Sequence, residues 1–305
     1  MRIVVAGGTG FLGSALSHAL VQDGHQLTVL TRGPDSSTAP DGKVRRVRWD
    51  AATPDRAWSS VVDGADAVIN LAGESIAGRR WSASQKQRIL DSRVSATRAL
   101  VQAIASAQKA PATFVSGSAV GYYGPLGDQI VTEDYPAGSD FLADVCRAWE
   151  AEAQTARPFS RVVCVRTGLV LAKDGGALGK MLLPFKLGAG GPLGSGRQYM
   201  PWIHRRDWVD LVRWSMLTAS VDGPVNATGP APVTNAEFTK SLGRALHRPA
   251  FMPAPAFALR LVFGEMADAL LLSGQRAVPQ KAERNGFQFQ FRTLEAALAE
   301  IFGHR

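Results

Sequence analysis

Short β-branched runs recur along the first two-thirds of the chain, and longer stretches with helical spacing of apolar residues separate them. Short apolar runs bounded by turn residues are typical of strands, whereas apolar residues three and four positions apart are typical of helices. Their alternation predicts βαβ units and a parallel sheet. The strands expected are Arg2–Ala6, Gln26–Thr31, Val44–Trp49, Ala67–Leu71, Thr113–Ser118 and Arg161–Thr167.

The clearest helical pattern spans roughly Ser84–Ala107, and another runs from about Phe141 to Ala156. After Gly168 the pattern changes, because glycine- and proline-rich connections separate shorter elements. The elements expected in this part are a helix at Asn235–Leu246, an apolar helical stretch at Phe257–Leu272, a strand at Phe287–Phe291 and a final helix at Leu294–Phe302.

The first predicted strand runs directly into three glycines spaced three apart, Gly7, Gly10 and Gly13, and a helical pattern follows at once. This order suits a dinucleotide pyrophosphate, because the glycines permit a tight turn, close backbone approach to the phosphates and close packing of helix on strand. The anion then lies at the positive end of the helix. We expect the three glycines, with Phe11 and Leu12 between them, to bind the cofactor; a simple turn is the alternative.

The end of the second strand indicates which dinucleotide is preferred. Sites that prefer NAD place an acidic residue there to accept from the ribose 2′-OH, whereas this chain has Thr31-Arg32. An arginine can pair with the 2′-phosphate of NADP, so we expect NADP (NADPH); a plain surface arginine is the alternative. The other residues expected at the cofactor are Asp50, near the adenine or in an ordinary loop, and Leu71, Ala72 and Gly73 after the fourth strand.

These features predict an α/β fold with a Rossmann-type, doubly wound parallel sheet and a smaller, discontinuous substrate-side lobe. We assign residues 1–167 to the NADP-binding domain. Residues 168–305 are assigned to the lobe and a C-terminal domain, with some segments returning to the first domain.

Several motifs resemble the extended short-chain dehydrogenase/reductase superfamily. The fifth strand leads into a stretch with Ser118 and Tyr123-Gly124, and hydroxyls at this edge of a parallel sheet lie where such folds do their chemistry. The other matching residues are Gly7, Gly10 and Gly13, Asn70–Gly73, Arg166-Thr-Gly-Leu-Val170 and Ile203-His-Arg-Arg-Asp207. The segments 196–204 and 274–279 are similar to a subgroup labelled epimerase family, or NAD(P)-dependent epimerase/dehydratase. Its C-terminal domain of unknown function would match the chain from about Pro249.

The chain departs from this superfamily at the usual proton relay, a tyrosine followed four residues later by a lysine that lowers the pKa of the phenol. None of the four tyrosines has such a lysine, and aligning Trp149-Glu150 with the equivalent helix puts Leu142 and Cys146 at the two positions. We expect Ser118 and Tyr123 to be catalytic, although a strand-end or packing role is open for each. The other residues expected at the site are Arg166, at the cofactor, and Glu74, Tyr199, Trp202 and His204, at the substrate; a structural role is open for Glu74 and His204.

Composition limits the class of protein. The 305-residue chain has 46% hydrophobic and 20% charged residues and a net charge of +8, but it shows no basic helix or aromatic–basic alternation, so we expect no nucleic-acid partner. The two cysteines lack metal-ligand spacing, and no apolar run reaches the length of a membrane span. We expect a cytoplasmic protein without a leader, metal or membrane contact, which acts on a small molecule and allows a homodimer.

The expected function is that of an NADP(H)-binding oxidoreductase or epimerase-like enzyme on a small polar substrate. Because the tyrosine–lysine pair is missing, a non-catalytic sensor that binds NADP(H) is the alternative.

Overall fold

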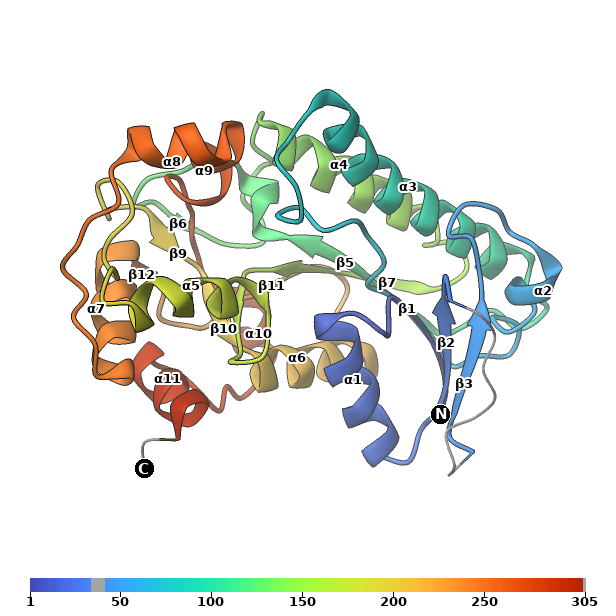
Figure 1. Ribbon diagram of the computed structural model, residues 1–305. Coiled ribbons are helices and arrows are strands. Elements are labelled where there is room, and N and C mark those ends of the chain that lie inside the picture. The colour runs from blue at the N-terminus through green and yellow to red at the C-terminus, as the bar shows by residue number, and fades with distance from the viewer. Residues whose placement is uncertain (34–41, 304–305) are drawn as a thin grey trace.

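A parallel sheet of seven strands lies at the centre of the molecule, in the order β11-β7-β5-β4-β1-β2-β3 (Figure 1). The structure is a computed structural model that describes residues 1–33 and 42–303. The chain turns back across the sheet between β1 and β4, and ligands of doubly wound folds bind outside the strand ends at this point. The strands are β1 (Arg2–Ala6), β2 (Gln26–Thr31), β3 (Val44–Arg48), β4 (Ala67–Asn70), β5 (Thr113–Ala119), β7 (Arg161–Thr167) and β11 (Gly223–Ala227).

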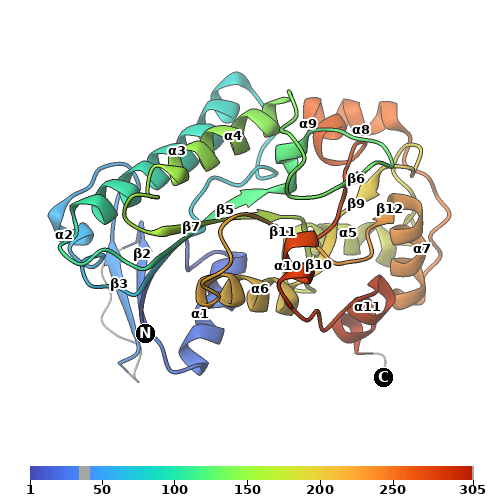
Figure 2. The ribbon, with the colours of Figure 1, turned by 180° about the vertical axis from the view of Figure 1, so that it is seen from behind.

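Helices cover both faces of this sheet (Figures 1 and 2). Apolar residues of α1 and α6 pack on one face, and those of α2, α3 and α4 pack on the other. Both faces of the central strands are therefore buried, which is why β1, β4 and β7 contain continuous apolar runs in the sequence. The helices are α1 (Phe11–Gln22), α2 (Arg56–Ser59), α3 (Ala83–Ser106), α4 (Phe141–Gln154) and α6 (Arg205–Leu217), with a 3₁₀ turn η1 (Val120–Tyr123) after β5.

Capping side chains explain where three helices begin. Ser82 accepts from the N–H of Gln85 at the start of α3, and Asp140 accepts from the N–H of Ala143 at the start of α4. Thr234 forms a reciprocal capping box with Glu237 at the start of the helix that follows it. Such caps satisfy N–H groups that have no partner within the helix.

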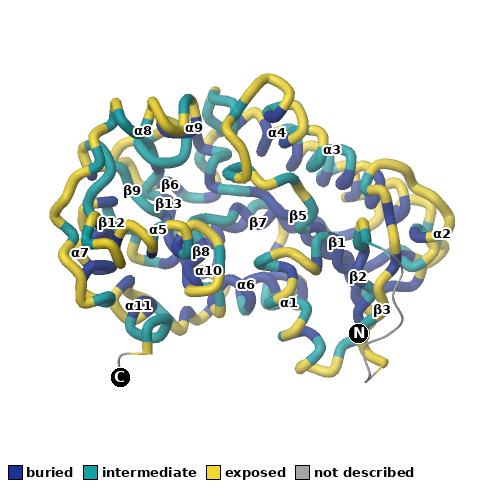
Figure 3. Tube along the Cα trace, in the orientation of Figure 1, coloured by how far each residue is buried: buried dark blue, intermediate teal, exposed yellow. Residues whose placement is uncertain are grey.

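A smaller lobe continues the molecule beyond β11 and β7, around its own apolar core. Short strand pairs build it, β8 with β10, β9 with β12 and β6 with β13. Figure 3 shows most of its outer helices in the colours of exposed and half-buried residues. Its elements are β6 (Ile130–Val131), β8 (Leu169–Leu171), α5 (Gly176–Lys186), β9 (Tyr199–Met200), β10 (Trp202–His204), β12 (Val233–Thr234), α7 (Asn235–Leu246), α8 (Ala256–Phe263), α9 (Glu265–Leu270), β13 (Arg276–Ala277) and α11 (Leu294–Phe302). α10 (Gln280–Arg284) packs against β11 instead.

The predicted Rossmann-type α/β fold is confirmed, and three local features differ from the sequence pattern. Strand β11 was not predicted, and the apolar stretch 257–272 is broken at Gly264, whose φ is +61°. The predicted strand at Phe287–Phe291 is not a strand. Its backbone N–H groups at Gln290 and Phe291 donate instead to the carboxylate of Asp207, at 2.8 and 3.0 Å, so the segment has partners without a β ladder.

Candidate functional site

The turn between β1 and α1, residues 7–13, is called the phosphate turn here. Gly7 has a φ of +77°, and a Cβ on it would lie 2.6 Å from the carbonyl carbon of Leu71. A Cβ on Gly13 would lie 2.8 Å from the carbonyl carbon of Gly7 and closer still to its oxygen. Neither position has room for a side chain, so strand, turn and helix lie in close contact. A dinucleotide pyrophosphate requires such a tight turn, because its phosphates approach the backbone closely.

The first N–H groups of α1 have no partner within the helix, and Gly10 caps it without a side chain. Phe11 and Leu12 therefore bring backbone N–H groups to the place where a phosphate would lie. Their side chains have other roles, because Leu12 packs against the core and the Phe11 ring lies against Gly175 and Gly176 of the lobe.

The ends of β2 and β3 lie side by side, with Thr31 opposite Arg48. Thr31 Oγ1 accepts from the N–H of Gly33 at 3.1 Å, and Arg32 is exposed. The Asp50 carboxylate accepts from the N–H groups of two residues that follow it, and these bonds hold its pKa below the ordinary value. Arg32 is thus placed at the edge where an adenosine ribose would lie in such a fold, while Asp50 closes its own turn.

Asn70 orders the loop after β4. It is buried, its Nδ2 donates to Thr97 Oγ1 at 2.9 Å, and its Oδ1 accepts from the N–H of Ala72 at 3.1 Å. The loop residues Leu71, Ala72 and Gly73 are thereby held beside the phosphate turn, which Leu71 touches at Gly7.

Glu74 comes next and is half-buried. Its backbone N–H donates to Ser92 Oγ at 2.9 Å, and its carbonyl oxygen accepts from Arg93 Nη1 at 3.0 Å. Burial lowers the pKa of Arg93, whose guanidinium also lies over the Trp149 ring. These contacts fix the backbone of the loop at Glu74 next to Gly73.

A second cluster lies at the ends of β5, β7 and β11 and is called the Arg166 network here. It consists of Ser118, Tyr123, Glu150, Arg166 and Asn226. The sheet register places Ser118 and Asn226 on either side of Arg166. Glu150 comes from α4 and Tyr123 from η1, so five separate elements meet at this point.

The Arg166 guanidinium is hydrogen-bonded to protein groups through all three of its nitrogens. Its Nε and Nη2 donate to the two carboxylate oxygens of Glu150 at 2.8 and 2.9 Å, and its Nη1 donates to Tyr123 Oη and to the carbonyl oxygen of Glu133, both at 3.0 Å. Although burial disfavours its charge, the bonds to Glu150 raise the pKa of Arg166. Arg166 is 3% exposed. The expected cofactor contact of its side chain is therefore corrected to a structural role.

Ser118 and Tyr123 belong to the same network. Ser118 Oγ donates to Glu150 Oε1 at 2.6 Å, and Tyr123 Oη donates to Asn226 Oδ1 at 2.6 Å. Tyr123 is 1% exposed, and burial raises its pKa to about 12. A phenol with this pKa is a poor acid or base near neutral pH, so the structure gives Tyr123 a packing and bonding position.

The two helix positions that align with the tyrosine and lysine of the superfamily are apolar. Leu142 lies against Gly121, and Cys146 is a buried thiol whose pKa burial raises to about 12. Sequence reasoning missed Glu150 and Asn226. Glu150 was detectable as a carboxylate on the apolar face of α4, between Cys146 and Ala153.

The predicted substrate-side residues are also held by protein groups. Trp202 is fully buried and its Nε1 donates to the carbonyl oxygen of Ala231 at 2.9 Å, so it has no surface for a ligand. His204 is buried, bonded to Glu300 at 2.9 Å and capped on the N–H of Arg206. These two expectations are corrected, because both side chains lie in the structural interior of the lobe.

Tyr199 differs from them. It is half-buried, and the guanidinium of Arg276 lies 5.1 Å from the centre of its ring. Its place on β9, beside β12, leaves it a candidate for substrate contact.

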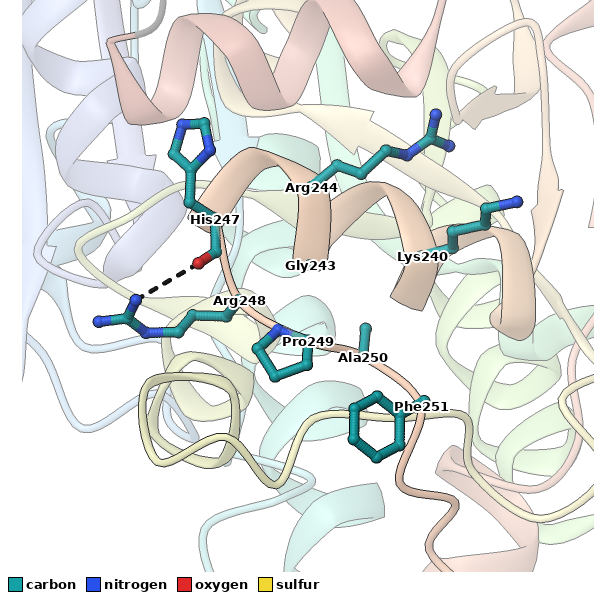
Figure 4. A pocket seen from close by; sticks show the side chains of 8 residues that line it. All are labelled: Lys240, Gly243, Arg244, His247, Arg248, Pro249, Ala250 and Phe251. Atoms are coloured by element: carbon teal, nitrogen blue, oxygen red, sulfur yellow. Dashed lines mark hydrogen bonds between the residues drawn. The ribbon is translucent and has the colours of Figure 1, made fainter.

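A hollow of about 610 Å³ lies elsewhere, at the carboxyl end of α7 (Figure 4). Lys240, Arg244, His247 and Arg248 contribute to its lining. Figure 4 shows Arg248 pointing to one side of it and Lys240 to the other, so the basic groups do not converge on a point. α7 lies at the outer end of the lobe in Figures 1 and 2, whereas α1 lies beside the central sheet, so this hollow is separate from the phosphate turn.

In residues 1–33 and 42–303, no helix is both long and apolar enough to cross a membrane. Within the same residues, no group of three or more His, Cys, Asp or Glu side chains is arranged to hold a metal ion.

Comparison with known proteins gives consistent results. Residues 3–227 match the model of the NAD dependent epimerase/dehydratase family, and residues 254–301 match a domain of unknown function, DUF1731. The bovine epimerase family protein SDR39U1 is 42% identical over 305 residues, with 99% of each chain covered. The Mycobacterium tuberculosis epimerase family protein MT2273 is 44% identical, covering 97% of this chain and 96% of that protein.

A solved structure agrees over the full length. The crystal structure of human epimerase family protein SDR39U1 (isoform 2) with NADPH has a TM-score of 0.90 and 39% identity, and 100% of both chains is covered. Because the family model matches most of the chain and the relatives match nearly all of it, the chain belongs to the NAD-dependent epimerase/dehydratase family.

Proposed function

We propose that this protein binds NADP(H) at the phosphate turn and acts as an oxidoreductase or epimerase-like enzyme on a small polar substrate. The main support is the phosphate turn itself, where Gly7 and Gly13 leave no space for a Cβ and the start of α1 offers free N–H groups. A similar human protein has been crystallised with NADPH. Exposed Arg32 at the end of β2 favours NADPH over NADH, because its guanidinium can pair with the 2′-phosphate.

In this proposal, the loop Leu71–Gly73, which follows β4, and Ser118, near the end of β5, lie on the nicotinamide side at the carboxyl edge of the sheet. Bound NADPH would supply a hydride to a carbonyl or imine carbon, and the oxygen or nitrogen would take up its proton from solvent. Ser118 Oγ has its proton directed at Glu150, so it presents lone pairs to a neighbouring group. Ser118 therefore orients a hydroxyl or amine donor of the substrate, with Glu74 and Tyr199 as further contacts.

The alternative is a sensor that binds NADP(H) without turnover. Its support is the absence of the usual relay, because Leu142 and Cys146 occupy the relay positions and the Tyr123 hydroxyl is buried. A small-molecule ligand and a cytoplasmic location belong to both versions of the proposal.

Measurements of binding and turnover separate these possibilities. Titration calorimetry with NADPH and NADH tests cofactor binding. A protein that binds neither dinucleotide would overturn both versions of the proposal. NADPH consumption with a panel of aldehydes and ketones tests net reduction, and chromatography of a panel of sugar nucleotides after incubation with the protein and NADP(H) tests epimerisation, which consumes no cofactor. We expect Ser118→Ala to reduce turnover at least about tenfold, because it removes one hydrogen bond to a charged group, while NADPH affinity is retained. Cys146→Ser should leave turnover unchanged. NADPH binding without turnover on any of these compounds would favour the sensor.

A further inference from the structure

Arg93 on α3 is a half-buried arginine at the loop after β4. Its Nη1 donates to the carbonyl oxygens of Glu74 and Ile89, both at 3.0 Å, and a Cβ on Gly73 would lie 3.1 Å from its Cζ. Burial lowers the pKa of Arg93, because the charge is drawn away from water. Across residues 1–33 and 42–303, no carboxylate forms an ion pair with it, so direct contact with an acidic group does not neutralise its charge.

Arg166 shows how a fully partnered arginine is bound in this fold. Its Nε and Nη2 together bind the two carboxylate oxygens of Glu150, the paired geometry that suits a guanidinium and a carboxylate. The same two nitrogens of Arg93 have no hydrogen-bond partner in the part of the chain that the structure describes, and they are not among the side-chain atoms sealed from solvent. Arg93 therefore keeps its carboxylate-binding edge available to a ligand.

The contacts of Arg93 place it beside the end of β5. Its guanidinium lies 5.2 Å from the centre of the Trp149 ring, and a Cβ on Gly117 of β5 would lie 2.8 Å from the same ring. Burial raises the pKa of the Cys146 thiol to about 12, and the charge of Arg93 and the Ser118 hydroxyl both oppose this shift, so both groups lie close to the thiol. Cys146 occupies the position of the relay lysine. Arg93 thus brings a cation from α3 to the place where the superfamily takes it from the helix that corresponds to α4.

We propose that Arg93 binds a carboxylate group of the substrate through its Nε and Nη2, so that the substrate is a small oxo acid or the hydroxy acid that its reduction gives. This inference rests on the proposed function, which supplies the reducible carbonyl group and the cofactor at the same strand ends. The local charge favours a monoanion. Glu74 acts on Arg93 through space without an ion pair, so one cation faces one neighbouring carboxylate, and a phosphate dianion would find too little positive charge.

Titration calorimetry with the full chain, with and without saturating NADPH, tests this assignment. The probes are oxamate and oxamide, which differ only in a carboxylate against a neutral amide and carry no ketone or aldehyde for the hydride. We expect oxamate to bind at least about tenfold more tightly than oxamide, and Arg93→Gln to abolish this preference, because the charged hydrogen-bond partner is lost. Arg88→Gln makes the same charge change at an exposed position of α3 and should bind oxamate as the parent does. NADPH binding by Arg93→Gln should be unchanged, which shows that the loop after β4 keeps its shape.

Glu74→Gln gives a second measurement that a purely structural role of Arg93 would not affect. The hydrogen bonds at Glu74 are made by its backbone, so this variant keeps them and removes only the negative charge near the guanidinium. Its affinity for oxamate should rise roughly threefold or more.

Three results would overturn the proposal: a parent that binds oxamate and oxamide equally, an Arg93→Gln variant that still prefers oxamate, or a loss of NADPH affinity in Arg93→Gln as large as the loss of oxamate affinity. The last result would assign Arg93 to the cofactor. Oxamate binding that requires Arg93 in a chain that does not bind NADPH would uphold the carboxylate site and contradict the proposed function alone.

Discussion

The phosphate turn and the Arg166 network lie at the carboxyl edge of one sheet, but they are built in different ways. The phosphate turn is a single segment of chain, and its shape depends on backbone atoms that approach closely at Gly7 and Gly13. The Arg166 network joins side chains from five elements that are far apart in the sequence. The first is shaped to receive a ligand, and the second satisfies its own charges.

The difference shows that a motif typical of a reactive site can have a structural role instead. Ser118 and Tyr123 carry the hydroxyls that the sequence pattern predicts to be reactive, yet here they donate hydrogen bonds to Glu150 and Asn226. A buried arginine whose Nε, Nη1 and Nη2 all donate to protein groups stabilises this end of the sheet rather than a ligand. We expect the phosphate turn to depend on backbone shape and the Arg166 network to depend on charge pairing.

The largest expected effect is on the Arg166 network. Arg166→Met leaves the Glu150 carboxylate buried without its cation, and breaking such a pair costs about 3–5 kcal/mol. In urea unfolding, the midpoint concentration of Arg166→Met should be lower than that of the parent. Arg98→Ala is the control, because the Arg98–Glu152 pair is exposed and should contribute little. Equal midpoints for the two variants would contradict the structural role of Arg166.

The phosphate turn should respond to a single methyl group. Gly13→Ala places a Cβ against the carbonyl group of Gly7, so the turn must open. We expect NADPH affinity to fall roughly a hundredfold, about 3 kcal/mol, as measured by calorimetry. Gly127→Ala is the control because nothing lies within 4 Å of the added Cβ. If Gly13→Ala bound NADPH as the parent does, the phosphate turn would not be the cofactor site.

Arg32 should determine the choice between cofactors. Arg32→Glu removes a charge-assisted partner of the 2′-phosphate and adds a repelling charge, so NADPH affinity should fall by about ten- to a hundredfold, roughly 1.5–3 kcal/mol. NADH affinity should change much less. Arg45→Glu makes the same charge change at another exposed position, on β3, and should preserve the preference for NADPH. Equal affinities of the parent for NADPH and NADH would exclude this role.

The smallest expected effect is on the pH dependence of stability at His204, which is buried like the residues of the Arg166 network. Burial lowers the pKa of His204 below 6.5, so the folded state holds a neutral ring while the unfolded chain takes up a proton below that pH. Stability should therefore be lost as pH falls below about 6.5, by less than about 1.4 kcal/mol per pH unit. His204→Asn should show a shallower loss between pH 6.5 and pH 5 in urea titrations. Identical slopes for parent and variant would show that His204 does not titrate on unfolding.

Much of the fold was predictable because its signals are local. Strands Arg2–Ala6, Gln26–Thr31 and Arg161–Thr167 match the prediction, since each is rich in β-branched and apolar residues, as strands of a parallel sheet covered on both faces are. Strand β11 lacked this signal. It is an edge strand with Gly223 and Pro224, and its pairing with β7 rather than its composition makes it a strand.

The sequence by itself determined the phosphate turn, because three glycines between a strand and a helix leave the backbone few other shapes. It also established that no tyrosine–lysine relay exists. Only the tertiary structure decided the partners of Ser118, Arg166 and His204. Each binds a carboxylate at least 16 residues away along the chain, as in the Arg166–Glu150 pair. A hydrogen bond depends on distance and direction between two groups, and for distant segments the packing of the whole sheet sets both.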